Sequence, residues 1–142
     1  MYNIERFYDV HRIYYGDALK EIQSGRKQSH WMWYIFPQLK TLGRSYKAVY
    51  FGIENAEEAR AFYDDSYLGE NLREICKALL RCESNNALEV MGHPDNLKLC
   101  SSMTLFYIVT KDELFSDILN KFYGGKQDER TVSFLTQPNI TH

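Results

Sequence analysis

The sequence predicts an all-α fold: a compact bundle of about seven short helices in one domain, residues 1–142, with an irregular segment near residues 31–42. Apolar residues recur every three or four positions along most of the chain, which is the period of an amphipathic helix. No alternating apolar–polar run is bounded by hairpin turns, so strands are not expected. With 142 residues and 44% hydrophobic content, the chain can bury a sizeable core.

The N-terminal half is expected to hold three helices. Apolar side chains share one face over residues 4–11 and again over residues 18–22, followed by Gly25, where a helix end favours positive φ. Asn55 and Glu58 then have the spacing of a capping box, which predicts a helix over residues 56–63.

Four further helices are expected in the C-terminal half. A long amphipathic helix covers residues 68–80 and closes near Asn85. The pair His93–Pro94 is typical of an N-cap followed by the first helical residue, with the helix running to Ile108. Residues 114–122 form another helix, stopped by Gly124, and residues 132–135 form a short last one.

Composition excludes several classes of protein. Apolar content and a net charge of −2 argue against disorder, and no run approaches the roughly 18 apolar residues of a membrane span. Charged residues interrupt the N-terminus before any signal-like apolar run. Cys76, Cys82 and Cys100 form no C-x-x-C pair, so buried reduced thiols and a cytoplasmic location are expected. The histidines have no metal-ligand spacing, so no metal and no cofactor is predicted.

The charge is unevenly distributed. Residues 26–47 contain five basic residues and no acid, whereas the rest of the chain carries 12 basic and 19 acidic residues, a net −7. Both tryptophans lie inside this basic segment. Because a purely solvated face has no need of aromatic side chains, the segment is the strongest candidate for a functional site.

Residues 26–38 combine cations, an imidazole, indoles and an amide. Lys27 can neutralise an anion, Trp31 or Trp33 can stack on a planar ring, and Gln38 can hydrogen-bond. His30 is the candidate acid or base, since imidazole exchanges a proton near neutral pH. For each aromatic residue, a place in the core is the alternative.

Two other stretches could complete a binding site. Arg44 can clamp an oxyanion and Ser45 can bind a ligand, although a loop with a serine cap explains both equally well. Farther on, Lys98, Ser101 and Ser102 can share one helix face and line a polar pocket. Close helix packing is the alternative for the two serines.

Three motifs resemble a known family: S-H-W-M-W-Y-I-F-P-Q at residues 29–38, L-G-R-S at 42–45, and K-L at 98–99 with S-S-M-T-L-F at 101–106. Cys100 departs from the family's pattern, which commonly has a basic residue there. The family is a bacterial domain of unknown function, often labelled "calpastatin" in genomes. The resemblance implies a small helical domain and no established activity, substrate or cofactor. The label conflicts with the composition, because an inhibitor of that kind would be disordered and poor in aromatics, whereas this chain is 15% aromatic.

The leading hypothesis is that residues 26–45 and 95–104 face one another across a pocket for a small anionic, nucleotide-like ligand. Whether the protein is an enzyme is left open. One alternative is a non-catalytic interaction module, in which the basic-aromatic segment meets a protein partner or a second copy with both tryptophans exposed. Another is weak single-stranded nucleic-acid binding, which the surrounding −7 charge disfavours. No membrane partner is expected.

Overall fold

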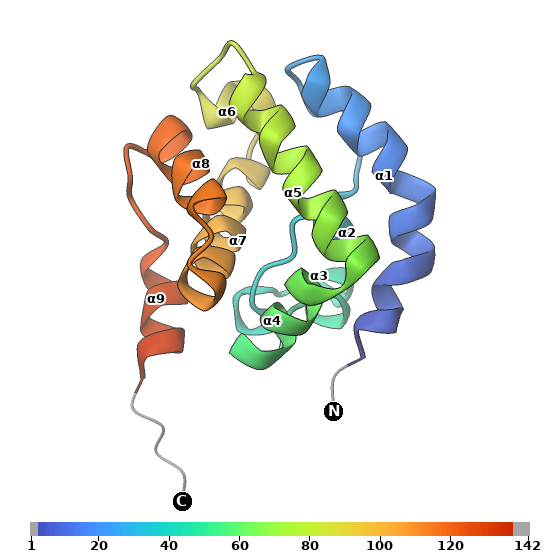
Figure 1. Cartoon of the computed structure of the whole chain (residues 1–142), viewed down its shortest axis with the longest axis vertical. Helices are drawn as coiled ribbons and strands as arrows, with labels where there is room; N and C mark the ends of the chain where they lie inside the picture. The colour runs from blue at the N-terminus through green and yellow to red at the C-terminus, as the bar shows by residue number, and fades with distance from the viewer. Residues whose placement is uncertain (1–2, 138–142) are drawn as a thin grey trace, which may run out of the picture.

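The computed structural model describes residues 3–137, and within them the chain is helical without a strand (Figure 1). The elements in chain order are η1 (Ile4–Phe7), α1 (Tyr8–Gln23), α2 (Met32–Ile35), η2 (Lys40–Leu42), α3 (Tyr46–Tyr50), α4 (Ala56–Asp64), α5 (Ser66–Arg81), α6 (Ala87–Met91), α7 (Asp95–Thr110), α8 (Glu113–Tyr123) and α9 (Glu129–Thr136). The predicted all-α fold is confirmed. None of these helices is long and apolar enough to cross a membrane.

The helix count differs from the prediction for local reasons. The two helices expected before Gly25 are one, since α1 runs unbroken through Gly16. A glycine inside a helix costs about 1 kcal/mol, and the packing of α1 against α5 outweighs that cost. The one-turn helices α2, α3 and α6 raise the number of α-helices over residues 3–137 to nine.

Several helix boundaries also differ from the prediction, among them one end of each of the two longest C-terminal helices. The long helix α5 ends at Arg81, before the expected closure near Asn85. Helix α7 begins at Asp95, with Pro94 in the capping position, so the start is one residue later than predicted.

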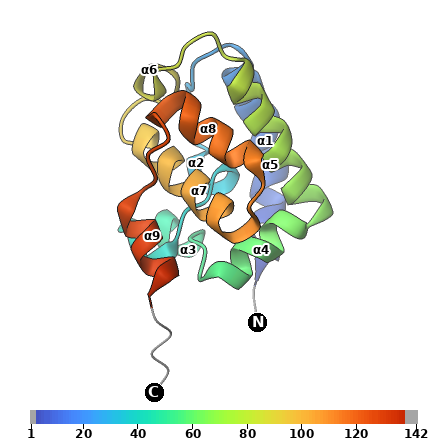
Figure 2. The ribbon, with the colours of Figure 1, turned by 60° about the vertical axis from the view of Figure 1, so that its left-hand side comes forward.

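Helix α7 lies at the centre of the molecule. It packs against α4, α6, α8 and α9, while α1 and α5 lie side by side (Figures 1 and 2). Its residues 101–106 are all buried. A helix covered on most sides needs apolar or small residues around its circumference, which explains why α7 has no clear polar face.

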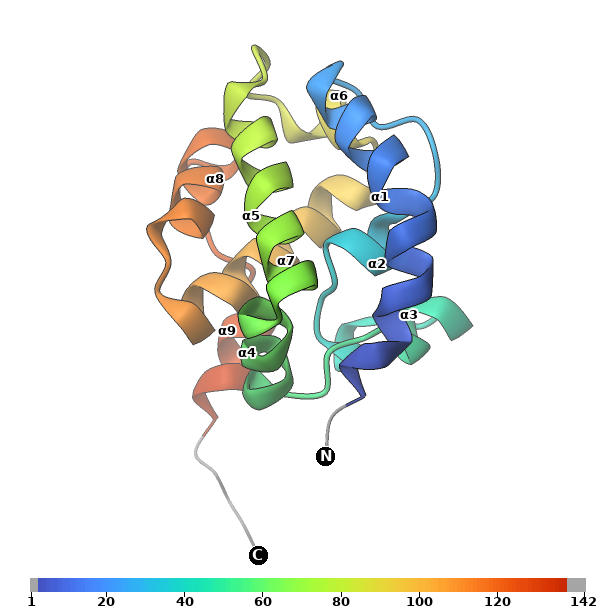
Figure 3. The same cartoon turned by 45° about the vertical axis from the view of Figure 1, so that its right-hand side comes forward.

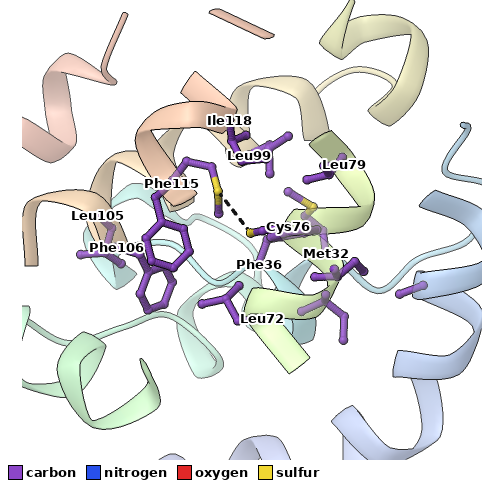
Figure 4. Close-up of a cluster of buried hydrophobic side chains, with 14 of the residues drawn as sticks. Met32, Phe36, Leu72, Cys76, Leu79, Leu99, Leu105, Phe106, Phe115 and Ile118 are labelled. Atoms are coloured by element: carbon purple, nitrogen blue, oxygen red, sulfur yellow. Dashed lines mark hydrogen bonds between the residues drawn. The ribbon is translucent and has the colours of Figure 1, made fainter. Parts of the chain in front are cut away.

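The segment that contains α2 is anchored in the core. Met32 and Phe36 point among the side chains of α5 and α7, next to Cys76, whose thiol contacts the Met103 sulfur at 3.7 Å (Figure 4). Trp31, Met32 and Phe36 are at most 2% exposed. Each such buried side chain contributes about 1.5–3 kcal/mol, so this stretch is rigidly held.

A close backbone contact brings α3 beside η2, and α3 lies below α2 in the view of Figure 3. The amide of Lys40 donates to the Ile53 carbonyl and the amide of Ile53 donates to the Gln38 carbonyl, both at 2.8 Å. Gly52 permits this approach, because a Cβ there would lie 2.4 Å from the Lys40 Cα. The loop is closed at its base, and α3 projects from it.

Candidate functional site

The carboxylate of Glu21 organises the loop between α1 and α2. It accepts hydrogen bonds from the Gln28 amide (2.7 Å), the Ser29 amide (3.0 Å) and hydroxyl (2.6 Å), and the Trp31 indole Nε1 (2.9 Å). Burial alone would raise the pKa of this carboxyl, but the hydrogen bonds outweigh it and lower the pKa to about 2. Glu21 therefore stays charged and fixes the loop.

Lys27 is held by protein partners. Its ammonium lies 2.8 Å from an Asp95 carboxylate oxygen, donates to the Ser29 carbonyl at 2.5 Å and sits 4.8 Å from the Trp31 ring centroid. The Lys27 side chain is only 6% exposed, and Trp31 is fully buried. This pair joins the loop to the start of α7.

Lys98 is held much more loosely, one turn later on α7. Its ammonium lies 3.9 Å from the other Asp95 oxygen, which is an ion-pair contact beyond hydrogen-bond length. It lies 5.5 Å from the centre of the half-buried Trp33 ring, and the Lys47 ammonium approaches the same ring at 5.1 Å. The Trp33 indole nitrogen is buried and has no hydrogen-bond partner. Buried donors are normally paired, so this indole N–H is an exception to the usual pattern.

These side chains surround a solvent-reachable hollow of about 250 Å³, here called the Trp33 hollow. Its lining residues are Lys27, Gln28, Ser29, His30, Met32, Trp33, His93, Pro94, Asp95 and Lys98. A smaller cavity of about 10 Å³ adjoins it, shares Met32, Trp33 and Lys98, and adds Gln38. That space is about enough for one water.

Four predicted site residues line the Trp33 hollow: Lys27, His30, Trp33 and Lys98. Gln38 reaches only the smaller cavity. Trp31 lies in the core with its indole bonded to Glu21, so the pattern with both tryptophans exposed does not occur.

Arg44 and Ser45 line neither space. Arg44 is exposed, and the Ser45 hydroxyl accepts from the Ala48 amide at 3.2 Å as the N-cap of α3. The loop-plus-cap interpretation describes this stretch, and Arg44 does not converge with His30 and Lys98.

Ser101 and Ser102 also lie outside both spaces. They are 2% and 0% exposed, and Ser101 donates to the Leu97 carbonyl one turn back at 3.3 Å. The Ser102 hydroxyl is buried without a partner. Both serve close packing of α7, since a larger side chain there would push the neighbouring helices apart.

The structure adds residues that the sequence reasoning did not assign to the site. His93 lines the hollow, Asp95 neutralises Lys27, and Lys47 approaches the Trp33 ring. The spacing from Asp95 to Lys98 was a signal for an ion pair within one helix turn. Glu21 and Lys47 reach the site through tertiary packing, which no local pattern encodes.

The hollow is lined by cationic, imidazole and aromatic side chains. Its lining includes the Lys98 side chain, two imidazoles and the Trp33 side chain, while the charge of Lys27 is balanced by Asp95. Residues 3–137 contain no group of three His, Cys, Asp or Glu side chains able to hold a metal ion.

Comparison with known proteins places these residues in a family. The family model described as "Protein of unknown function (DUF1810)" matches residues 1–135. The chain belongs to this family. The Trp33 hollow lies wholly within the matched region.

A solved structure shares the fold. The conserved hypothetical protein Rv1873 from Mycobacterium tuberculosis is 42% identical, with a TM-score of 0.90, over 92% of this chain and 94% of that one. No curated protein matches the sequence. Family membership therefore supplies the fold and leaves the function to be argued from the site.

Proposed function

We propose that the protein binds a small anionic ligand that carries a planar ring, such as a nucleotide, in the Trp33 hollow. The observation that carries the proposal is the convergence of His30, Trp33 and Lys98 on one solvent-reachable space beside an unpaired indole N–H. Lys98 is the cation free to meet the anion, because its contact with Asp95 is long.

The ring of the ligand would lie against the ring of Trp33. The Lys27–Asp95 pair positions the hollow and does not bind the anion, since its charges already satisfy one another. His30 is exposed on the lining and is the group that would exchange a proton with the bound molecule, if the ligand is a substrate.

A calorimetric titration with nucleotides and sugar phosphates tests the proposal. We expect binding by at least one nucleotide, weakened at least tenfold by Lys98→Met and by Trp33→Leu. Lys77→Met, which removes an exposed lysine from α5, is the matched control and should change nothing. The proposal is wrong if the whole panel fails to bind, or if Lys98→Met and Lys77→Met bind equally well.

A further inference from the structure

The outer face of α3 carries two stacked tyrosines. Tyr46 and Tyr50 are 79% and 47% exposed, with ring centroids 5.9 Å apart and planes 15° from parallel. Their i, i+4 spacing puts them on one helix face, while Ala48 is buried on the opposite face. Two exposed tyrosines on a five-residue helix contribute little to the core, so their arrangement calls for another explanation.

Positive charge flanks this aromatic face and links it to the Trp33 hollow. Arg44 and Lys47 are exposed on either side of Tyr46, and the chain has no acidic residue between Glu21 and Glu54. The Lys47 ammonium reaches back over Trp33, the ring that Lys98 also approaches. Aromatic rings and cations therefore continue from the hollow onto the surface of α3.

The size and charge of this face decide between possible occupants. A stable protein interface covers about 800 Å² on each partner, whereas a tyrosine presents at most about 250 Å². Two partly exposed rings fall well short of that area. A second copy would also bring Arg44 and Lys47 against their own equivalents. Stacking of nucleic-acid bases needs only ring faces with cations nearby for the phosphates.

We propose that α3 extends the Trp33 hollow into a binding track for single-stranded nucleic acid. One nucleotide would occupy the hollow, and the following bases would stack on Tyr46 and Tyr50 while Arg44 and Lys47 contact the phosphates. The proposal rests on the proposed function, because the hollow supplies the first nucleotide position. A duplex would not bind in this way, since its bases are already stacked on one another.

Fluorescence anisotropy with labelled 12-mers of uridine and of thymidine nucleotides tests the track, with the mononucleotides UMP and TMP measured by calorimetry. We expect at least one 12-mer to bind tenfold or more tightly than its mononucleotide. Replacing both tyrosines by serine should remove that gain and leave mononucleotide affinity unchanged. Ile13→Ser, at an α1 position that is 68% exposed, is the matched control and should have no effect. Binding should weaken with salt at a slope of about −2, as expected for three phosphate contacts.

The results distinguish a failure of the binding track on α3 from a failure of the Trp33 hollow as a nucleotide site. If a mononucleotide binds but its 12-mer binds no more tightly, the track is wrong and the hollow stands. If neither binds, both proposals fall. Equal binding of a duplex overturns the stacking on Tyr46 and Tyr50. Self-association that the double tyrosine variant abolishes, without 12-mer binding, would assign α3 to a contact between copies and would also overturn the track.

Discussion

The two tryptophans of one segment each lie beside a lysine, and the two lysine–tryptophan pairs have opposite environments. The ammonium of Lys27 lies 4.8 Å from the Trp31 ring, and that of Lys98 lies 5.5 Å from the Trp33 ring. In the first pair, Asp95 and Ser29 satisfy the cation and Glu21 satisfies the indole. In the second pair, the cation has only a 3.9 Å contact and the indole N–H has no partner.

For these two pairs, the difference in hydrogen bonding distinguishes the pair that holds the loop from the pair that lines the hollow. A buried polar group with all its partners holds a fold together, while one left unpaired costs about 1–3 kcal/mol that a ligand or water can recover. The first pair fixes the loop, and the second pair lines the hollow that this loop creates. The predictions that follow test this contrast from the largest effect to the smallest.

Trp31→Ala should cost about 3–5 kcal/mol in the free energy of unfolding, as is usual for a large aromatic lost from a core. It also leaves the Glu21 carboxylate short of one donor. Trp33→Ala should cost clearly less, because Trp33 is only half-buried. Urea unfolding monitored by circular dichroism measures both. Equal losses would show that Trp33 is a core residue of the same kind as Trp31.

Asp95→Ala should cost roughly 2–3 kcal/mol, because it leaves the nearly buried Lys27 ammonium without its carboxylate. Lys98→Met should change stability by less than about 0.5 kcal/mol, since its side chain is 28% exposed and its ion pair is long. Urea unfolding of the two variants compares the pairs directly. A loss in Lys98→Met as large as that in Asp95→Ala would contradict the assignment of Lys98 to ligand binding.

The Glu21 contacts make the first pair sensitive to acid. The folded-state pKa of about 2 lies below the ordinary value of 4.5, so the stabilisation is present above pH 4.5 and is lost as the pH falls toward 2. After allowance for solvent screening, we expect about 1–2 kcal/mol. Unfolding in urea at pH 5 and pH 3 should show a smaller fall in Glu21→Gln than in the native protein. An identical fall in both proteins would exclude this carboxylate as the cause.

Local patterns in the sequence were enough to predict the longer helices and some of their caps, but not the one-turn helices α2, α3 and α6. Asn55 accepts from the Glu58 amide at 3.0 Å as its spacing indicated, and Gly25 takes a φ of +85° at the end of α1. Helix periodicity reports which residues are buried along one element, so it located the core faces well. It placed the first two helices apart because Gly16 interrupts the pattern but not the helix.

The site was harder to predict, because its contacts join distant parts of the chain. Trp31 and Trp33 are two residues apart. No local pattern indicates that Glu21 accepts a hydrogen bond from the Trp31 indole while the Trp33 indole has no partner. The predicted roles of Arg44 and Ser45 depended on the direction of a loop. That direction is set by the close contact at Gly52, which a sequence pattern does not reveal.

The smallest effect concerns the charge around Trp33 itself. In a Trp31→Phe protein only Trp33 emits, and the ammonium groups of Lys47 and Lys98 near its ring should attract the anionic quencher iodide. At constant ionic strength, Lys47→Met should lower the iodide quenching constant by about a third and leave quenching by neutral acrylamide unchanged, because charge changes and exposure does not. A matching fall in acrylamide quenching would mean that Lys47 acts by holding the ring in place. Iodide quenching that responds to Lys98→Met in the same way would show that both cations act on one ring, which is the condition that an anion bound beside Trp33 requires.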